Sequence, residues 1–323
     1  MGLAGDATTA AWQRRAVESR KGYAYGLGAY VSWGFFPIYF KLLQPAGAVE
    51  ILAHRVIWSV LFITGILTAI RQWRPLRAAF SRRSARGGIV LAAALIAVNW
   101  AAYIYGVNSD RIVETALGYF IGPLVSVLIG VLVLRERLRP AQWVAVGIGA
   151  VAVAVLTVNY GRVPYIALTL AVTFSTYGLI KKRLALPAAH GLFVESAVLA
   201  VPCLAYLGWL VWQGDSTFGH VSAGHTALML GAGAATAIPL LLFAGAANRL
   251  PLTVLGLLQY VAPVLQFGVG VLIFHEPMPP ARLAGFALVW TALVIFTVDG
   301  LRHARQSRMA TLAATPEPAA VQS

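Results

Sequence analysis

The side chains best suited to chemistry in this sequence are a few ionisable residues inside, or at the ends of, long apolar stretches. Glu50, His54 and Arg55 lie close together; on a helix Glu50 and His54 share a face, and Arg55 lies about 100° round from His54. Glu114 begins another apolar stretch, and Glu195 lies within a third. Ionisable groups in such surroundings are costly, so each is a candidate for substrate binding, gating or proton transfer.

Each of these candidates has a structural interpretation beside the functional one. Arg55 either snorkels toward the outer surface or faces the interior, where it pairs with Glu114 as a gate or meets an anionic group of a substrate. His54 is either a packed, hydrogen-bonded histidine or a group whose titration couples transport to protons. Glu195 either snorkels to the cytoplasmic face or belongs to the site.

Uncharged polar side chains within the apolar stretches complete the candidate substrate-binding or gating site: Asn99, Tyr103, Tyr119 and Gln259. Amides inside a membrane usually hydrogen-bond one helix to another. The lining of an amphipathic cavity needs the same residue types, so both interpretations stay open.

Other kinds of chemistry have no support in the sequence. A phosphate-binding G-x-x-x-x-G-K-[ST] motif is missing, as are H-E-x-x-H and G-x-S-x-G, and Cys203 is the one cysteine. We therefore expect no ATP hydrolysis, no metal or other cofactor and no enzyme activity. The formal charge of +14 comes from residues in loops, so it predicts contacts with anionic lipid headgroups and no nucleic-acid binding.

The elements that must position these residues are membrane-spanning helices. The chain is 59% hydrophobic and only 11% charged, too apolar for one water-soluble core, and its apolar stretches have the roughly 20-residue length that crosses a bilayer. Ten spans are expected, all helical because unpaired backbone is intolerable in lipid. They cover approximately residues 24–43, 51–70, 88–107, 112–134, 141–158, 165–180, 192–212, 226–247, 252–274 and 283–298.

The loops between these spans predict the sidedness. Most of the 25 Lys and Arg residues fall in alternate loops and at the two termini, whereas the other loops hold only Lys41, Arg111, Arg162 and Arg282. Basic loops are retained in the cytoplasm, so both termini are predicted to be cytoplasmic. Residues 1–23 form an N-terminal cytoplasmic segment, and residues 301–323 are predicted to be a disordered tail.

An internal repeat relates the two halves of the chain. The sequence from Pro123 matches the sequence from Pro263 at a constant offset of 140 residues, with Pro123, Gly130, Glu136 and Pro140 recurring as Pro263, Gly270, Glu276 and Pro280. An odd number of spans separates the copies, so they have opposite orientations in the membrane. The sequence thus predicts two inverted five-helix repeats, residues 24–160 and 161–300, an arrangement typical of secondary transporters.

Two features of the repeat have a structural explanation. Glu136 and Glu276 precede helices that begin near Pro140 and Pro280, where an acid complements the helix dipole. Small residues spaced by four permit close helix packing: Ala141, Ala145 and Gly149 in one copy, Ala281 and Gly285 in the other.

Several specific runs resemble a known family. The segments are Ala29-Tyr-Val-Ser-Trp-Gly, Glu50-Ile-Leu-Ala-His-Arg, the run from Val107 to Leu124, Thr236-Ala-Ile-Pro-Leu and Leu255-Gly-Leu-Leu-Gln-Tyr-Val-Ala-Pro. Together they resemble the RarD proteins, EamA-type permeases of the drug/metabolite transporter superfamily, over about residues 22–299. One departure is Gly122, where the family pattern has asparagine.

The resemblance implies a ten-span inverted fold in the bacterial plasma membrane, with a central cavity between the halves. The family is commonly described as chloramphenicol-sensitivity permeases, and it offers no agreed binding residues to transfer. We therefore expect a secondary transporter of small metabolites or drugs that works by alternating access. The alternative is a membrane receptor or sensor on the same fold, and the sequence leaves the substrate and a homodimer open.

Overall fold

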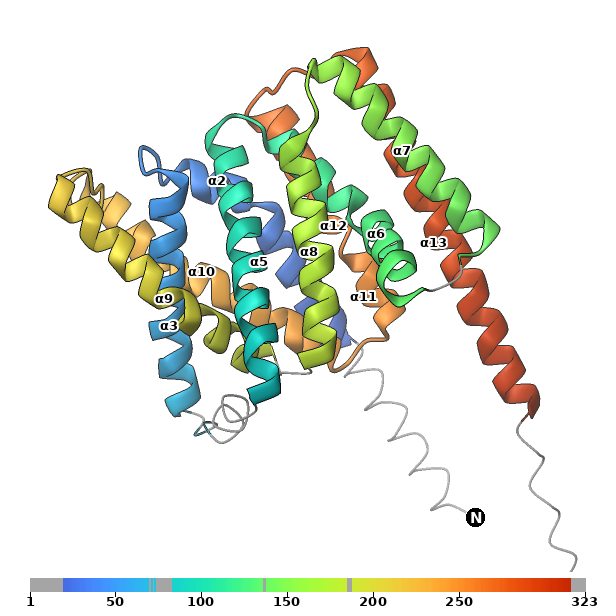
Figure 1. The fold of residues 1–323 in the computed structure, drawn as a ribbon, viewed down its shortest axis with the longest axis horizontal. Helices are drawn as coiled ribbons and strands as arrows, with labels where there is room; N and C mark the ends of the chain where they lie inside the picture. The colour runs from blue at the N-terminus through green and yellow to red at the C-terminus, as the bar shows by residue number, and fades with distance from the viewer. Residues whose placement is uncertain are drawn as a thin grey trace, which may run out of the picture. The chain divides into compact units, whose positions relative to one another are not determined.

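The computed structural model describes residues 20–69, 71, 73, 83–135, 138–184 and 188–314. All regular secondary structure in these residues is helical. A helical stretch over residues 20–34 comes first. It is followed by α2 (Phe36–Lys41), α3 (Ala48–Ala69), α5 (Arg83–Asn108), α6 (Ile112–Leu134), α7 (Pro140–Tyr160), α8 (Tyr165–Leu184), α9 (Ala188–Gln213), α10 (Ala223–Ala247), α11 (Leu252–Leu258), α12 (Val261–Gly268), the π-helix η1 (Val269–Ile273) and α13 (Pro280–Ala314) (Figure 1).

Eight segments of the described chain are long and apolar enough to cross a membrane. They are Ala48–Ala69, Arg86–Asn108, Ile112–Val133, Pro140–Tyr160, His190–Gln213, Ala223–Ala247, Val254–Ile273 and Pro280–His303. Each coincides with one of the ten predicted spans. A ninth, shorter apolar helix, Tyr165–Lys181, coincides with the predicted sixth span. The all-helical membrane class is therefore confirmed, while the count of ten and the sidedness stay predictions.

The predicted first span is an interrupted helix. Phe35 forms a turn between the helical stretch 20–34 and α2. Pro37 has no N–H to donate to the carbonyl of Trp33, four residues earlier, so the helical hydrogen-bond ladder fails at this point. The amide Nε2 of Gln266 donates to that carbonyl oxygen at 3.0 Å, which satisfies the group that the proline leaves unpaired.

The predicted ninth span is interrupted in the same way. Helix α11 ends at Leu258, Gln259 and Tyr260 form a turn, and α12 begins at Val261. Pro263 cannot donate to the carbonyl of Gln259, and the π-helix η1 follows α12 directly. Both predicted spans are therefore divided close to a proline that removes a helical hydrogen bond.

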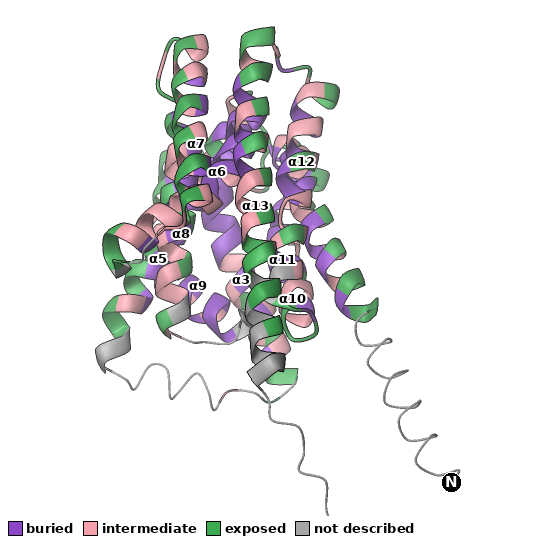
Figure 2. Ribbon diagram, turned by 90° about the vertical axis from the view of Figure 1, so that its right-hand side faces the viewer, coloured by how far each residue is buried: buried purple, intermediate pink, exposed green. Residues whose placement is uncertain are grey.

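The described residues belong to two compact units, one within residues 1–122 and 165–277, the other within 123–164 and 278–323. In the first unit α3 packs against α5, α9 and α10, and α5 packs against α8. Buried residues run along α3 (Figure 2). Helices α3 and α10 approach closely at Gly233, where a Cβ atom would lie 2.3 Å from the backbone of Trp58. Residue 233 must therefore be glycine for these helices to meet.

In the second unit α7 and α13 lie along each other and run antiparallel. Arg139, at the start of α7, pairs with Asp299 in the later part of α13, with Nε 2.7 Å from Oδ2. At the other end Arg282 donates to Oδ1 of Asn159 at 3.3 Å. A Cβ atom on Gly285 would lie 2.6 Å from Cγ of Leu156, so the small residues predicted to allow close packing do allow it here.

Two predictions at the ends of elements need correction or fall outside the described chain. Helix α13 continues to Ala314, so the segment predicted to be disordered from residue 301 is helical up to that residue. The predicted capping role of Glu136 lies outside the described residues.

Candidate functional site

Arg55 is the centre of the candidate site. It lies on α3 with 5% of its surface exposed, so it faces the interior and does not snorkel. Its Nε donates to the hydroxyl oxygen of Thr236 on α10 at 2.7 Å, and that hydroxyl donates to the carbonyl of Ala232 at 2.8 Å. Neither terminal nitrogen of the guanidinium has a hydrogen-bond partner among the described residues, and no carboxylate there pairs with it.

Aromatic rings surround the guanidinium. The central carbon of the group lies 4.1 Å from the ring centre of Trp100 on α5, and 5.6 and 5.7 Å from those of Phe36 and Phe40 on α2. Cation–π attraction to these rings stabilises a charge that has lost its water. Phe36 and Phe40 are one helical turn apart, and they reach Arg55 from the short helix that follows the break at Phe35. We call Arg55, Thr236, Trp100, Phe36 and Phe40 the arginine cage.

Tyrosine hydroxyls lie within electrostatic range of the cage, from Tyr39, Tyr103 and Tyr119. The hydroxyl of Tyr103 is buried and has no partner. The hydroxyl of Tyr119 donates to Oδ1 of Asn99 at 3.3 Å. The structure thus brings the predicted residues Tyr103 and Tyr119 together with Arg55.

Asn99 mainly joins helices. Its Nδ2 donates to the carbonyl of Leu170 at 3.1 Å and to the hydroxyl of Thr173 at 3.0 Å, which ties α5 to α8. The amide is buried. Through its hydrogen bond from Tyr119, Asn99 positions that tyrosine near the cage.

Glu114 does not pair with Arg55, contrary to one prediction. Its Oε1 accepts a hydrogen bond from the backbone N–H of Ile166 at 3.1 Å, at the start of α8. The first N–H groups of a helix lack partners within the helix, and an acid there also complements the dipole. Glu114 therefore caps a neighbouring helix.

Glu276 and Glu50 also accept hydrogen bonds from backbone N–H groups of other segments, Glu276 at a helix start and Glu50 in the loop between α9 and α10. Glu276 accepts from the backbone N–H groups of Ile112 and, at 2.9 Å, Val113, so it caps α6 and not its own following helix α13. Burial raises the pKa of the Glu276 carboxyl, and these two N–H groups partly oppose the change. Glu50 accepts from the N–H of Thr217 at 2.8 Å.

His54 lies beside Arg55 in the sequence but outside the cage. Its Nδ1 accepts from the indole N–H of Trp58 at 3.2 Å, and its ring stacks on Phe218 with the ring centres 4.6 Å apart. Its Nε2 is buried without a partner, as is Nδ1 of His225, whose Nε2 lies 2.9 Å from the carbonyl oxygen of Leu43. The histidine is packed, and proton coupling through it stays a prediction.

Glu195 belongs to a separate ion pair that joins α8 to α9. Its Oε1 lies 2.7 Å from Nζ of Lys181, and its Oε2 accepts from the hydroxyl of Tyr177 at 2.9 Å. The residue is 4% exposed, so it does not snorkel. A Cβ atom on Gly191 would lie 2.1 Å from the Lys181 nitrogen, so glycine at 191 leaves room for the pair.

Gln259 lies in the turn between α11 and α12, at the carbonyl that Pro263 leaves without its helical donor. Of the other cage members, Thr236, Phe36 and Phe40 were not predicted to be site residues. The spacing of Phe36 and Phe40 by four residues was a usable signal. The approach of α10 to α3 brings Thr236 to Arg55, and no pattern in the sequence indicated it.

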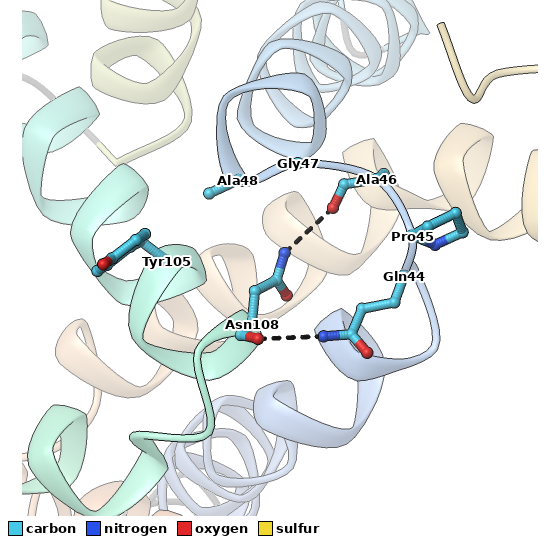
Figure 3. A pocket seen from close by; sticks show the side chains of 7 residues that line it. All are labelled: Gln44, Pro45, Ala46, Gly47, Ala48, Tyr105 and Asn108. Atoms are coloured by element: carbon cyan, nitrogen blue, oxygen red, sulfur yellow. Dashed lines mark hydrogen bonds between the residues drawn. The ribbon is translucent and has the colours of Figure 1, made fainter. Parts of the chain in front are cut away.

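A cavity of about 620 Å³ lies elsewhere, between the α2–α3 turn and the end of α5 (Figure 3). Its lining is Gln44, Pro45, Ala46, Gly47, Ala48, Tyr105 and Asn108. Asn108 donates to the carbonyl of Ala46 at 3.1 Å, and Gln44 donates to the carbonyl of Asn108 at 3.2 Å. These bonds fix the turn against α5. No member of the arginine cage lines this cavity, and none of its lining residues is charged.

Comparison with known proteins places the chain in a family. A family model of the EamA-like transporter family matches residues 20–158. Protein RarD of Streptomyces exfoliatus is 55% identical, over 93% of this chain and 95% of that protein. The uncharacterized transporter YojE of Bacillus subtilis is 42% identical, over 90% of this chain and 98% of that protein.

A solved crystal structure supports the fold. It is similar with a TM-score of 0.56 over 87% of this chain and 98% of that chain, at 19% sequence identity, so the likeness concerns the fold alone. The sequence relatives carry the family assignment, and their names describe transporters and not enzymes. The chain belongs to the RarD-type permeases of the EamA-like transporter family and is a multi-pass membrane transporter.

Proposed function

We propose that the protein is a secondary transporter that moves small metabolites or drugs by alternating access, with the arginine cage as part of its substrate site. The observation that carries this proposal is a buried cation without a carboxylate partner, enclosed by aromatic rings in the interior of a membrane protein. Burial removes the guanidinium from water, and no counter-ion among the described residues offsets this cost. A buried charge of this kind is therefore a candidate for function.

The two interrupted helices support the same proposal. The stretch 20–34 contacts α11 and α12: a Cβ atom on Gly34 would lie 2.6 Å from Leu265, and the hydroxyl of Tyr30 donates to the carbonyl of Leu255 at 3.5 Å. Secondary transporters typically bind substrates near such discontinuous helices, where the backbone leaves the regular ladder. Here the second segment of one interrupted helix, α2, supplies two rings of the cage.

Alternating access requires two related halves, and we propose that the two five-helix repeats supply them. The sequence repeat at an offset of 140 residues makes Asn159 equivalent to Asp299. These two residues make corresponding contacts with arginines at opposite ends of the α7–α13 pair, Arg282 and Arg139. The antiparallel packing of these two equivalent helices supports an inverted relation between the repeats.

The proposal includes the membrane and the orientation. We place the protein in the bacterial plasma membrane with ten spans and both termini in the cytoplasm, where the basic loops contact anionic lipids. Nothing in the sequence provides for ATP hydrolysis, so ion coupling, exchange or facilitated diffusion would drive transport.

Reconstitution tests this function. Purified full-length protein in liposomes is offered three labelled aromatic probes that differ in charge: neutral chloramphenicol, anionic phenylacetate and cationic phenethylamine. We expect saturable flux of at least one probe above that of protein-free liposomes. Saturable binding without flux of any probe would favour the receptor alternative. If no probe binds and no probe crosses the membrane, the proposal is contradicted.

A further inference from the structure

The charges around Arg55 define what the site lacks. The acids nearest to it in the sequence and in the predicted gate, Glu50 and Glu114, accept hydrogen bonds from backbone N–H groups of other segments. Glu195 is held by Lys181. The cage therefore contains one positive charge that the described residues do not neutralise. A ligand with a single negative charge would neutralise it.

The free donors of the guanidinium define the shape of that charge. Nε is occupied by Thr236, which leaves the two terminal nitrogens to bind together. Two parallel N–H donors in one plane match the two oxygens of a carboxylate. The unpartnered hydroxyl of Tyr103 supplies one further donor within electrostatic range of the guanidinium.

The walls of the cage define the rest of the ligand. Trp100, Phe36 and Phe40 present ring surfaces, and the neighbouring Tyr103 and Tyr119 rings lie with their centres 5.8 Å apart. Flat apolar groups pack well against such rings. A doubly charged group such as a phosphate ester would leave a net negative charge in these surroundings, which one arginine cannot neutralise.

From these observations we propose that the substrates are small organic monocarboxylates with a flat apolar body, and that Arg55 binds the carboxylate while the aromatic rings of the cage and its tyrosines hold the body. This inference rests on the proposed transport function and adds the substrate class to it. No bond is made or broken; the anion replaces the missing counter-ion of Arg55 and is released when the site opens to the other side.

The test uses thermal unfolding of the full-length protein in detergent, since a ligand that binds only the folded state raises its apparent melting temperature. The probes are phenylacetate and phenylacetamide, which share a shape and differ in charge, with phenethylamine as the cation. We expect phenylacetate alone to raise the melting temperature. In Arg55→Gln the apparent affinity for phenylacetate should fall by about tenfold or more, the value of a lost charge-assisted pair.

Two further variants separate charge from geometry. Arg55→Lys keeps the charge but loses the planar pair of donors, so it should bind phenylacetate more weakly than the wild type and better than Arg55→Gln. Arg249→Gln removes an exposed arginine that contacts Tyr25 and the Gly245 carbonyl, and it should leave the phenylacetate response unchanged. If Arg55→Gln does not fold, Thr236→Val must weaken the response, because it removes the support of Nε without changing the volume.

The outcomes distinguish this inference from the proposed function. Equal responses to phenylacetate and phenylacetamide, or an undiminished phenylacetate response in Arg55→Gln or in its substitute Thr236→Val, overturn the assignment of the carboxylate to Arg55. Saturable flux of chloramphenicol or phenethylamine without any response to phenylacetate overturns the substrate class and leaves transport intact. Absence of flux and binding for every probe contradicts both.

Discussion

Arg55 and Glu195 are buried to nearly the same extent in one compact unit, yet their surroundings differ. Glu195 has a lysine at 2.7 Å and a tyrosine hydroxyl at 2.9 Å, so both of its oxygens are used. Arg55 has one hydroxyl and three aromatic rings, and its two terminal nitrogens are unused. The comparison distinguishes a charge that holds two helices together from a charge that is available to a ligand.

Three further acids make the comparison clearer: Glu50 and Glu114, which the sequence placed with the functional candidates, and Glu276, which it predicted to cap its own following helix. Glu50, Glu114 and Glu276 each accept hydrogen bonds from the backbone N–H groups of another segment. Their charges are balanced by the peptide groups of loops and helix ends. A buried acid in a membrane protein is therefore a functional candidate only after its local partners are known.

The largest effect should come from breaking the Glu195 pair. Lys181→Met leaves a buried carboxylate without its cation, and we expect a loss of about 3 kcal/mol in the free energy of unfolding. Thermal or denaturant unfolding in detergent measures it. The double variant Lys181→Met, Glu195→Gln should recover much of the loss, since it removes the unpaired charge as well. If the double variant loses as much stability as Lys181→Met alone, the pair does not have this role.

A smaller effect should follow from separating α3 and α10. Gly233→Ala places a methyl group against the backbone of Trp58, and overpacking of this kind costs about 1–3 kcal/mol. The displacement also moves Thr236 away from Arg55, so flux should fall by more than the loss of folded protein explains. Gly208→Ala is a matched control, because a Cβ atom there meets nothing within 4 Å. Equal flux in the two variants would show that the cage tolerates the displacement.

Arg55→Gln should change the free energy of unfolding by less than about 1 kcal/mol. Arg55 has no carboxylate partner among the described residues, so its removal leaves no buried charge unpaired. Flux of the transported probe should nevertheless be lost. Unfolding and proteoliposome measurements on the same preparation check both parts. A loss of stability near that of Lys181→Met, with flux retained in the folded fraction, would make Arg55 a structural residue like Glu195.

The smallest effect concerns pH. The pKa of Glu276 is raised by burial, so the folded state binds its proton more readily than the unfolded state does. Its contribution to stability is complete below the ordinary carboxyl pKa and is lost as the pH rises through the raised value. Wild type should thus lose stability relative to Glu276→Gln as the pH rises above the ordinary carboxyl pKa of about 4.3. If the free energy of unfolding depends on pH equally in the two proteins, the Glu276 carboxyl does not titrate in this range.

Much of the fold could be predicted from local sequence. Eight long spans and the shorter α8 follow from stretches of apolar residues, because hydrocarbon thickness sets their length. Two predicted spans are interrupted, at Phe35 and at Gln259. Pro37 and Pro263 marked the places, but proline in a membrane helix is often accommodated without a break, and the partner that satisfies Trp33, Gln266, comes from far along the chain.

The structure brings together some of the candidate site residues. Arg55, Tyr103 and Tyr119 lie near one another in the interior, since polar groups in apolar helices turn away from lipid. Pairing Arg55 with Glu114 failed, because opposite charges in a sequence do not reveal which acid is already used by a backbone N–H group. Phe36 and Phe40 were hidden among many aromatic residues, although their spacing by four places them on one face of a helix.

The sequence by itself therefore determined the class of protein, the helical spans and the family, all of which depend on composition, span length and similarity along the chain. The tertiary structure alone decided which buried charges are neutralised and which is not. That distinction depends on partners from α3, α5, α8 and α10, which lie far apart in sequence and meet only because their helices pack together. Electrostatic balance in a membrane interior is set by distances of a few ångströms, and no linear pattern encodes those distances.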